Sequence, residues 1–356
     1  MAKNKSINIK DVAAYAHVGI STVSRVLNGT KKVSTDKEKR VLDAVDALNY
    51  EVNKLAKGLK SGKTNLICVI VPSIQSIFFP ILLHNIHIAA QKHGYSVSIF
   101  ETERDVEVEK RYIQLLKSQL IDGILLSSSA DTDDPLSKEY IDNLSSLSFN
   151  GKSIPVILLE AEVSNQLDCV VVNDQKAIFD ATHYLLSIGR KNIAYIGGPH
   201  IFEVAKNRKI GYISAMRYAG IPILDHYMIE GDYTARSGFE CMQKLIDSGV
   251  ALDGLVAAND QMAIGAMHCA TEKGLKIPEE VSIVGIDNNV VSSLLSPSLT
   301  TMNVPKEKMG EYAFELLLKR LNNPELKRQK IVLDANLIKR QTTERNISTE
   351  WDLTDF

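Results

Sequence analysis

Short, unbroken apolar runs recur through most of the chain and constrain its fold more than any other feature. Helical or turn-rich stretches separate most of them, including a helical stretch over 81–92. Strands that are apolar at every position are buried on both faces, which is typical of parallel sheets covered by helices. The sequence therefore predicts an α/β core of two Rossmann-like lobes that binds ligands beyond the carboxyl ends of its strands. The runs cover 66–71, 95–100, 124–126, 156–159, 170–172, 193–196, 254–257 and 281–284.

The motifs that would indicate catalysis are missing from this core. Gly197-Gly198-Pro199 follows a strand without completing a GxGxxG fingerprint, and the chain has neither a P-loop nor a GxSxG elbow. His84 and His87 lie on one face of a predicted helix, but no third ligand or intervening Glu accompanies them. Such a pair is more typical of a surface or a subunit interface. We expect no enzymatic activity, no cofactor and no metal.

Composition favours a globular protein of a reducing compartment. The 356 residues allow two or three domains, and no apolar run reaches the ~18 residues that span a bilayer. The first eight residues are polar and lysine-rich, without the apolar region of a signal peptide. We therefore expect a cytoplasmic protein with free thiols. The cysteines, each isolated and without a CxxC partner, are Cys68, Cys169, Cys241 and Cys269.

Positive charge is concentrated at the N-terminus. Residues 1–62 contain 12 Lys and Arg against 6 Asp and Glu, whereas the rest of the chain contains 29 against 37. A basic segment on a larger acidic body indicates a polyanionic partner for the first segment only.

Three short helical patterns follow one another in this basic segment. Asn8 can cap a helix over 9–16, residues 17–19 suit a turn, a second helix covers 20–28, and a third begins at Ser34. Helix, turn and a second helix with a short-polar outer face suit a helix-turn-helix that enters the major groove. A three-helix structural or protein-binding module remains the alternative. The polar side chains of the second helix are Ser21, Thr22, Ser24, Arg25 and Asn28.

The same residues resemble the headpiece of the LacI/GalR family of bacterial transcription regulators. The matching stretches are 9–13, 22–28, Val33-Ser34 and 48–50. By this resemblance Ile20, Ser21 and Arg25 would face bases, while Asn28 and Ser34 would hold phosphates. Two positions depart from the family pattern: His17 replaces the usual turn glycine, and Gly19 replaces the usual serine cap. His tolerates a positive φ better than most residues, so the motif stays intact.

Residues 51–62 resemble the hinge of that family, which folds into a helix on DNA beside its twin from a second subunit. Leu59 falls on the position that wedges into the minor groove and kinks the duplex. Asn53, Ala56 and Lys57 would contact DNA beside it. Val52 and Lys57 replace the family's usual Pro and Arg, and a plain flexible linker remains the alternative.

The resemblance continues through the core, which is similar to periplasmic sugar-binding proteins. Matching stretches include 76–80, 205–212, 258–267 and 285–288. Sugars need planar polar partners for their hydroxyls and an aromatic surface for their apolar face. By the resemblance the effector-binding residues are Phe78, Phe79, Ser127, Glu160, Arg208, Tyr233, Asn259 and Asp287.

Some of these residues have structural alternatives. Phe78 and Phe79 could belong to the core, and Arg208 and Asp287 could form a structural ion pair. Glu160 replaces a shorter Asp that the family often follows with Arg, here Ala161, so the ligand could be smaller or differently charged.

The resemblance implies a repressor of a carbohydrate-utilisation operon, released from near-palindromic operator DNA by a sugar or sugar derivative. Its dimer interface would use helices 81–92 and 106–118, and ligand-driven lobe movement would separate the two Leu59 hinges. A global catabolite regulator with a protein co-effector and a solute receptor without a DNA role are the alternatives. A tail without leucine heptads disfavours a tetramer.

The expected domains are a helix-turn-helix headpiece over 1–50, a hinge over 51–62, an effector core over 63–340 and a tail over 341–356. Within the core we expect lobe one over 63–160 and 304–330, and lobe two over 161–303 and 331–340.

Overall fold

The computed structural model describes residues 7–28, 31–50, 63–119 and 121–347. The chain separates into two compact units, Met1–Thr64 and Asn65–Phe356. In the described residues no helix is long and apolar enough to cross a bilayer.

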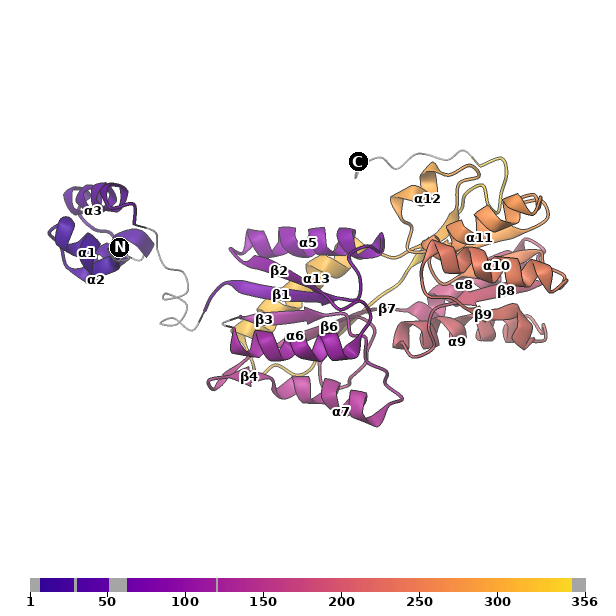
Figure 1. The fold of residues 1–356 in the computed structure, drawn as a ribbon, viewed down its shortest axis with the longest axis horizontal. Helices are drawn as coiled ribbons and strands as arrows, with labels where there is room; N and C mark the ends of the chain where they lie inside the picture. Colours follow the sequence, from indigo (N-terminus) through magenta and orange to yellow (C-terminus); the bar gives the residue numbers. More distant parts are fainter. Residues whose placement is uncertain (1–6, 29–30, 51–62, 120, 348–356) are drawn as a thin grey trace, which may run out of the picture. The chain divides into compact units, whose positions relative to one another are not determined.

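The first unit contains α1 (Ile9–Tyr15), α2 (Ile20–Asn28) and α3 (Thr35–Ala47), packed together (Figure 1). Its core is small and apolar, with Val12, Val23, Val41 and Ala44 fully buried. The Asn8 side chain accepts a hydrogen bond from the Lys10 amide at 2.9 Å, so the predicted N-cap is confirmed.

The turn between α1 and α2 depends on two side chains. His17 has a φ of 50°, the left-handed conformation that its place in the glycine position predicted. The guanidinium of Arg40, on α3, donates to the Ala16 carbonyl at 2.6 and 3.1 Å and to the His17 carbonyl at 2.8 Å. Arg40 therefore joins the third helix to the turn between the first two.

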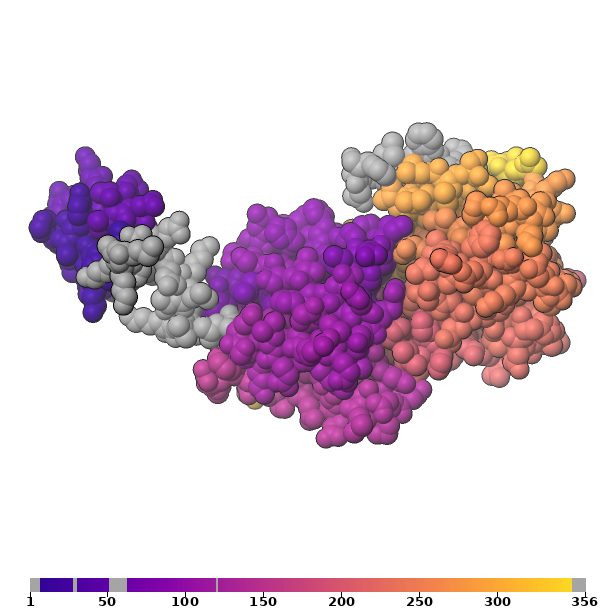
Figure 2. All heavy atoms as spheres, in the orientation of Figure 1, coloured from indigo at the N-terminus to yellow at the C-terminus, as the bar shows by residue number. Residues whose placement is uncertain are grey.

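The second unit consists of two lobes, each built on a twisted sheet, and the two lobes abut in the space-filling view (Figure 2). The first sheet has the order β13-β7-β6-β3-β1-β2 and its described strands all pair in parallel. Helix α13 lies beside α5 although they are far apart in the chain (Figure 1). The strands are β1 (Leu66–Val71), β2 (Ser96–Glu101), β3 (Gly123–Leu126), β6 (Val156–Glu160), β7 (Asp168–Val172) and β13 (Lys330–Leu333). The helices of this lobe are α5 (Phe78–Lys92), α6 (Val106–Ser118), α7 (Pro135–Asn143) and α13 (Lys306–Asn322), and a short hairpin pairs β4 (Ser148–Phe149) with β5 (Lys152–Ser153).

The second sheet has the order β14-β12-β11-β10-β8-β9, and β14 pairs antiparallel to β12 at its edge. The strands are β8 (Ile193–Gly197), β9 (Met228–Glu230), β10 (Gly254–Ala257), β11 (Ser282–Ile286), β12 (Thr300–Asn303) and β14 (Asn336–Ile338). The helices are α8 (Asp174–Ser187), α9 (Glu203–Tyr218), α10 (Ala235–Asp247), α11 (Asp260–Glu272) and α12 (Val290–Leu294). Two lobes, one with a parallel sheet and one with a sheet that is parallel except for β14, agree with the fold class that the apolar runs predict.

The lobe boundaries differ from the expected ones. Strand β7 pairs with β6 in the first sheet, so the first crossing between lobes lies after 172 and not at 160. Strand β13 also belongs to the first sheet, so residues 331–333 are not part of lobe two. The expected tail begins too early, because Thr342 is fully buried and its hydroxyl donates to the Ile283 carbonyl at 2.7 Å. Only strand pairing reveals these assignments, since β13 is a short strand of four residues that begins with a lysine, and β7 resembles its neighbours on either side.

Asp168, at the start of β7, is the buried partner of an ion pair with Arg320 that joins β7 to α13 in lobe one. Its carboxylate accepts from the Arg320 guanidinium at 2.8 and 2.9 Å and from the Gln329 amide at 2.7 Å. The side chain of Asp168 is 3% exposed and that of Arg320 17%, so removing one charge leaves the other poorly solvated.

Asp168→Asn should lower the free energy of unfolding by about 3 kcal/mol in urea titrations followed by circular dichroism. The control is Glu240→Gln, which breaks an exposed pair with Arg236 and should cost under about 0.5 kcal/mol. Equal losses in the two variants would contradict the structural role of the buried pair.

Candidate functional site

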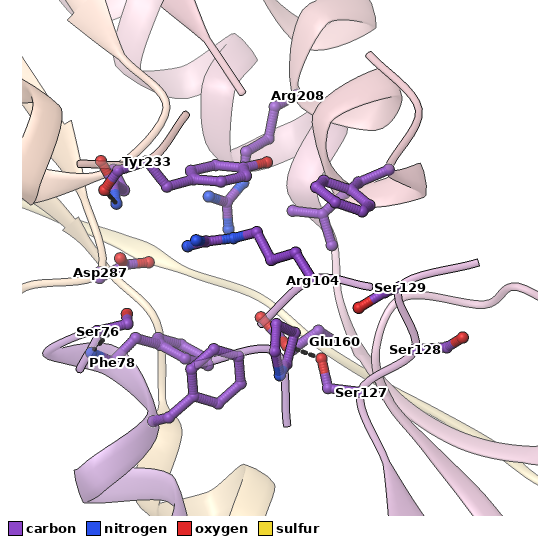
Figure 3. Close-up of a pocket in the computed structure, with 15 residues that line it drawn as sticks. Ser76, Phe78, Arg104, Ser127, Ser128, Ser129, Glu160, Arg208, Tyr233 and Asp287 are labelled. Carbon is purple, nitrogen blue, oxygen red and sulfur yellow. Dashed lines mark hydrogen bonds between the residues drawn. The ribbon is translucent and has the colours of Figure 1, made fainter. Parts of the chain in front are cut away.

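All eight residues expected to bind the effector line one cavity between the two lobes. The cavity has a volume of about 610 Å³, including its open mouth, a size that suits a small molecule. Most of its polar side chains follow the carboxyl ends of strands from both sheets, where ligands bind in α/β folds. Figure 3 shows them converging from above and below the cleft. The lining residues are Pro72, Ser76, Phe78, Phe79, Arg104, Ser127, Ser128, Ser129, Glu160, Phe202, Val204, Arg208, Tyr233, Asn259 and Asp287.

Arg208, on α9, is held by a partner that the sequence analysis did not identify. Its Nε donates to Asp174 Oδ1 at 2.7 Å, and an Nη donates to the Ala258 carbonyl at 2.5 Å. Although burial opposes the charged form, Asp174 and Asp287 raise the pKa of Arg208 above its ordinary value. Among the described residues the ion pair of Arg208 is with Asp174 and not with Asp287, so the expected structural alternative for Asp287 does not apply.

Asp287 follows β11 on a turn that the surrounding structure holds rigidly. Asp287 and Asn288 have φ values of 112° and 52°, a strained conformation for residues other than glycine. The buried Lys306 ammonium donates to the Asp287 carbonyl and, at 3.5 Å, to that of Asn288. Burial raises the pKa of the Asp287 carboxyl to about 8, which Arg208 partly opposes.

Glu160, the last residue of β6, accepts a short hydrogen bond from the Ser127 hydroxyl. Burial raises the pKa of the Glu160 carboxyl to about 7, against the lowering effect of Ser127. Its φ of 66° turns the chain away from the strand and points the carboxyl into the cleft (Figure 3). The larger acid at this position therefore still reaches the cavity.

Tyr233 and Asn259 are linked on the second lobe. The Asn259 amide donates to the Tyr233 carbonyl at 3.0 Å, and its oxygen caps α11 by accepting from the Met262 amide at 2.9 Å. This geometry gives Asn259 a positioning role beside any ligand contact. The Tyr233 ring lies against Gly198, where a Cβ would come within 2.1 Å of the ring, and its hydroxyl is buried with no partner among the described residues.

Phe78 and Phe79 begin α5 and pack edge to face, with ring centroids 5.2 Å apart. Each is 6% exposed, and both also belong to the hydrophobic core. They serve as core and as cavity wall at once, so the two alternatives are not exclusive.

Arg104 is the main polar residue of the cavity that the sequence analysis missed. It follows β2, the edge strand next to β1 in the first sheet. Residues at or beyond the carboxyl ends of β1, β2, β3 and β6 all line the cavity. The Arg104 guanidinium carbon lies 5.6 Å from the centroid of the Tyr233 ring. The available signal was a charged residue a few positions beyond a predicted strand end, where ligands bind in α/β folds.

Polar contacts join the lobes at the rim of the cleft. The Lys206 ammonium, on α9, lies 3.0 Å from Asp131 Oδ1 and 2.6 Å from Asp133 Oδ2 of the first lobe. The Thr132 hydroxyl donates to Glu203 at 2.8 Å. These contacts hold the lobes together on one side of the cavity.

In the headpiece the predicted base-facing side chains of α2 are solvent-exposed. Ile20 is 45% exposed, and Ser21 and Arg25 are also exposed, whereas Val23 between them is fully buried. Thr22 and Ser24 are half-buried, and Ser34 is exposed before α3. The predicted contacts of Asn53, Ala56, Lys57 and Leu59, and the side chain of Asn28, lie outside the described residues.

Predictions about metals and histidines can be compared with the same described residues. They contain no group of three His, Cys, Asp or Glu side chains that could hold a metal ion. His84 and His87 are exposed on α5, as their spacing indicated.

Family models match both units of the chain. Residues 8–53 match the model of bacterial regulatory proteins of the lacI family, and residues 182–343 match a periplasmic binding protein-like domain.

Two relatives with assigned names align over almost the whole chain. Catabolite control protein A of Priestia megaterium is 32% identical over 341 residues, covering 95% of this chain and 100% of the relative. The HTH-type transcriptional repressor PurR of Pasteurella multocida is 33% identical over 340 residues, covering 95% and 99%.

Two solved structures are also similar. The Lac repressor dimer bound to operator and the anti-inducer ONPF has a TM-score of 0.82 at 29% identity, covering 95% of this chain and 99% of that one. A LacI family regulator of Enterococcus faecium with bound ribose has a TM-score of 0.68 at 28% identity, covering 78% and 98%.

The raised pKa of Glu160 predicts a pH-dependent cost to stability. Because the folded state holds the proton up to about pH 7 and the unfolded state only to about 4.5, the free energy of unfolding falls as pH rises between these values. Glu160→Gln removes this contribution, so its stability relative to wild type should increase by about 2 kcal/mol between pH 5 and pH 8. Denaturant titrations at both pH values measure it, with Glu240→Gln as control. If the free energies of unfolding of Glu160→Gln and wild type differed by the same amount at both pH values, the raised pKa of Glu160 would be ruled out.

Proposed function

This chain belongs to the LacI family of bacterial regulatory proteins, which are DNA-binding transcription regulators and not enzymes, and we propose that it represses a carbohydrate-utilisation operon under the control of a sugar or sugar-derivative effector. The observation that carries the proposal is the convergence of eight expected ligand-contacting side chains on one cavity. Its carboxyls, guanidinium groups and serine hydroxyls suit a ring of hydroxyls, and its phenylalanine and tyrosine rings suit the apolar face of a sugar. The similar Enterococcus faecium regulator binds ribose, which supports the same ligand class.

For the DNA complex we propose a twofold dimer in which α2 enters the major groove of each half-site. The exposed face of α2 supports Ile20, Ser21 and Arg25 as base contacts, with Thr22, Ser24, Asn28 and Ser34 around them. The similar Lac repressor is a dimer on its operator, which supports the stoichiometry. The interface proposed from the sequence uses α5 and α6, and Leu59 would insert into the minor groove between half-sites.

The proposed mechanism couples two equilibria. Ligand contacts from both lobes favour the closed cleft, and the rim contacts of Lys206 and Glu203 stabilise the same arrangement. Closure changes the separation of the two hinge segments in the dimer, and separated hinges do not fold on DNA. An effector can shift the DNA equilibrium only by its preference for one lobe arrangement over the other.

The second candidate is a global catabolite regulator with a protein co-effector. The 32% identity with catabolite control protein A over almost the full length favours it. If the purified protein captured a phosphocarrier protein and no sugar raised its melting temperature, this second candidate would replace the first proposal.

The operator test starts from a randomised DNA library. The full-length protein should select a near-palindromic site, and Arg25→Ala should bind that site at least about 10-fold more weakly, because a good base contact contributes about 1–3 kcal/mol. Leu59→Ala should also weaken binding and reduce the response to ligand. Anisotropy titrations at one salt concentration give the Kd values.

Arg217→Ala, which alters an exposed arginine at the end of α9, is the control and should bind like wild type. Enrichment of no sequence over bulk DNA would contradict the proposed operator recognition.

The effector test is a thermal-shift screen of neutral mono- and disaccharides, sugar phosphates, sugar acids and purines. A ligand at 100 times its Kd should stabilise the protein by about 2.7 kcal/mol. Asp287→Ala should abolish the shift, whereas Asp225→Ala, at an exposed position of the second lobe, should preserve it. A shift that survives Asp287→Ala would contradict the proposed site.

A further inference from the structure

Arg104 is a cavity cation whose backbone is held in an unusual conformation. Glu103 and Arg104 have consecutive φ values of 53° and 62°, which are costly for residues other than glycine. The turn is anchored by the fully buried Thr102, whose amide donates to the Val71 carbonyl at 3.0 Å and whose hydroxyl lies 3.3 Å from that of Ser129. The anchor keeps the Arg104 side chain over the cleft.

The Arg104 side chain reaches from the first lobe to the second. Its guanidinium lies 5.6 Å from the Tyr233 ring centroid, within range of a cation–π contact. Figure 3 shows the Arg104 and Arg208 guanidinium groups directed to the same part of the cavity beside Tyr233. Two positive groups thus converge where a ligand would lie.

Only one of these two charges is balanced by an ion pair in the described residues. Arg208 pairs with Asp174, whereas no described carboxylate forms an ion pair with Arg104. Burial opposes the charged form of Asp232, and hydrogen bonds from Ser237 and Thr234, with a smaller effect of Arg104, lower its pKa. Its carboxylate accepts from the amide and hydroxyl of Thr234 at 2.8 and 2.6 Å and forms no ion pair with Arg104. Glu160 likewise has its hydrogen bond from Ser127.

The two acids of the cavity offset the positive charge only in part. Burial raises the pKa of Glu160 to about 7 and of Asp287 to about 8, so near neutral pH these carboxyls hold protons for much of the time. A protonated carboxyl can donate a hydrogen bond. The Tyr233 hydroxyl, buried and without a described partner, is a further donor.

We propose that the effector is a sugar derivative with a carboxylate or phosphate group, and that Arg104 binds this anionic group. The inference rests on the proposed function, because it names the ligand class of the same cavity. A guanidinium binds either anion through two parallel hydrogen bonds, and the cation–π contact with Tyr233 holds the Arg104 guanidinium near the ligand position. A neutral sugar would instead close the lobes over an unpaired guanidinium, which is unfavourable.

Matched ligand pairs test the proposal by isothermal titration of the full-length protein at pH 7. Each neutral sugar is compared with its phosphate and its acid: glucose with glucose 6-phosphate and glucuronate, galactose with its equivalents, and ribose with ribose 5-phosphate and ribonate. At least one anionic member should bind about 10- to 100-fold more tightly than its neutral parent. The phosphate and acid arms distinguish the two anions.

Variants then assign the effect to Arg104. Arg104→Gln should reduce the affinity for the anionic ligand about 10- to 100-fold and leave that for the neutral parent within about twofold. Arg104→Lys should restore part of the loss, because it keeps the charge without the planar fork. Arg217→Gln is the matched control, and unchanged operator binding shows that each variant is folded.

The failures are distinguishable. Neutral sugars that bind as tightly as their anionic partners, or an anionic preference that survives Arg104→Gln, would overturn this inference and leave the sugar-controlled regulator standing. If no sugar, neutral or anionic, bound in the titrations, both this inference and the proposed sugar-controlled function would be overturned.

Discussion

The chain passes between the two lobes after β7, after β12 and after β13, and the cleft depends on these crossings in the described part of the core. Asp174, just past the first crossing, forms an ion pair with Arg208 and so joins the start of α8 to α9 in the second lobe. Lys306, just past the second, holds the turn that carries Asp287. Asn173 donates to Asp334 at 3.2 Å and links the first crossing to the third. The connections between lobes therefore also orient the groups that would meet a ligand.

The cleft stores strain and charge in the same place. Glu160, Tyr233, Asp287 and Arg104 all have positive φ, and two of the four are acids whose ionisation burial opposes. A fold optimised for stability alone would avoid both features, which persist where surrounding structure over-determines the backbone. A ligand that satisfies these groups gains the interaction without the cost of organising them, and can therefore bias the lobe equilibrium.

The headpiece depends on polar contacts more than the effector core does, because its own apolar core is small. Its geometry relies on specific polar contacts: the Asn8 cap, and the Arg40 guanidinium that binds the carbonyls of the turn. Arg40 was not identified from the sequence because it lies 24 residues from Ala16, and only packing of α3 against the turn brings them together. Val23 is fully buried in the headpiece core while Ser21 and Arg25 on the same helix are exposed, so packing of Val23 fixes which face of α2 is presented to solvent.

The amino-acid sequence by itself determined the α/β class and the helical pattern of the headpiece, because both depend on local patterns of apolar runs and caps. The eight residues that line one cavity came from the resemblance to the LacI/GalR family and not from a local pattern. The sequence also identified His17 as a positive-φ turn residue. Strands as short as β13 and β14 were not identified from the sequence, so the sheets to which they belong, and the lobe boundary after β7, came only from strand pairing. Tertiary structure likewise decided the partner of Arg208, the lack of an ion pair to Arg104 among the described residues, and the raised pKa values of Glu160 and Asp287. Distances between residues far apart in the chain, and burial from water, set those properties, and neither is encoded at any single position.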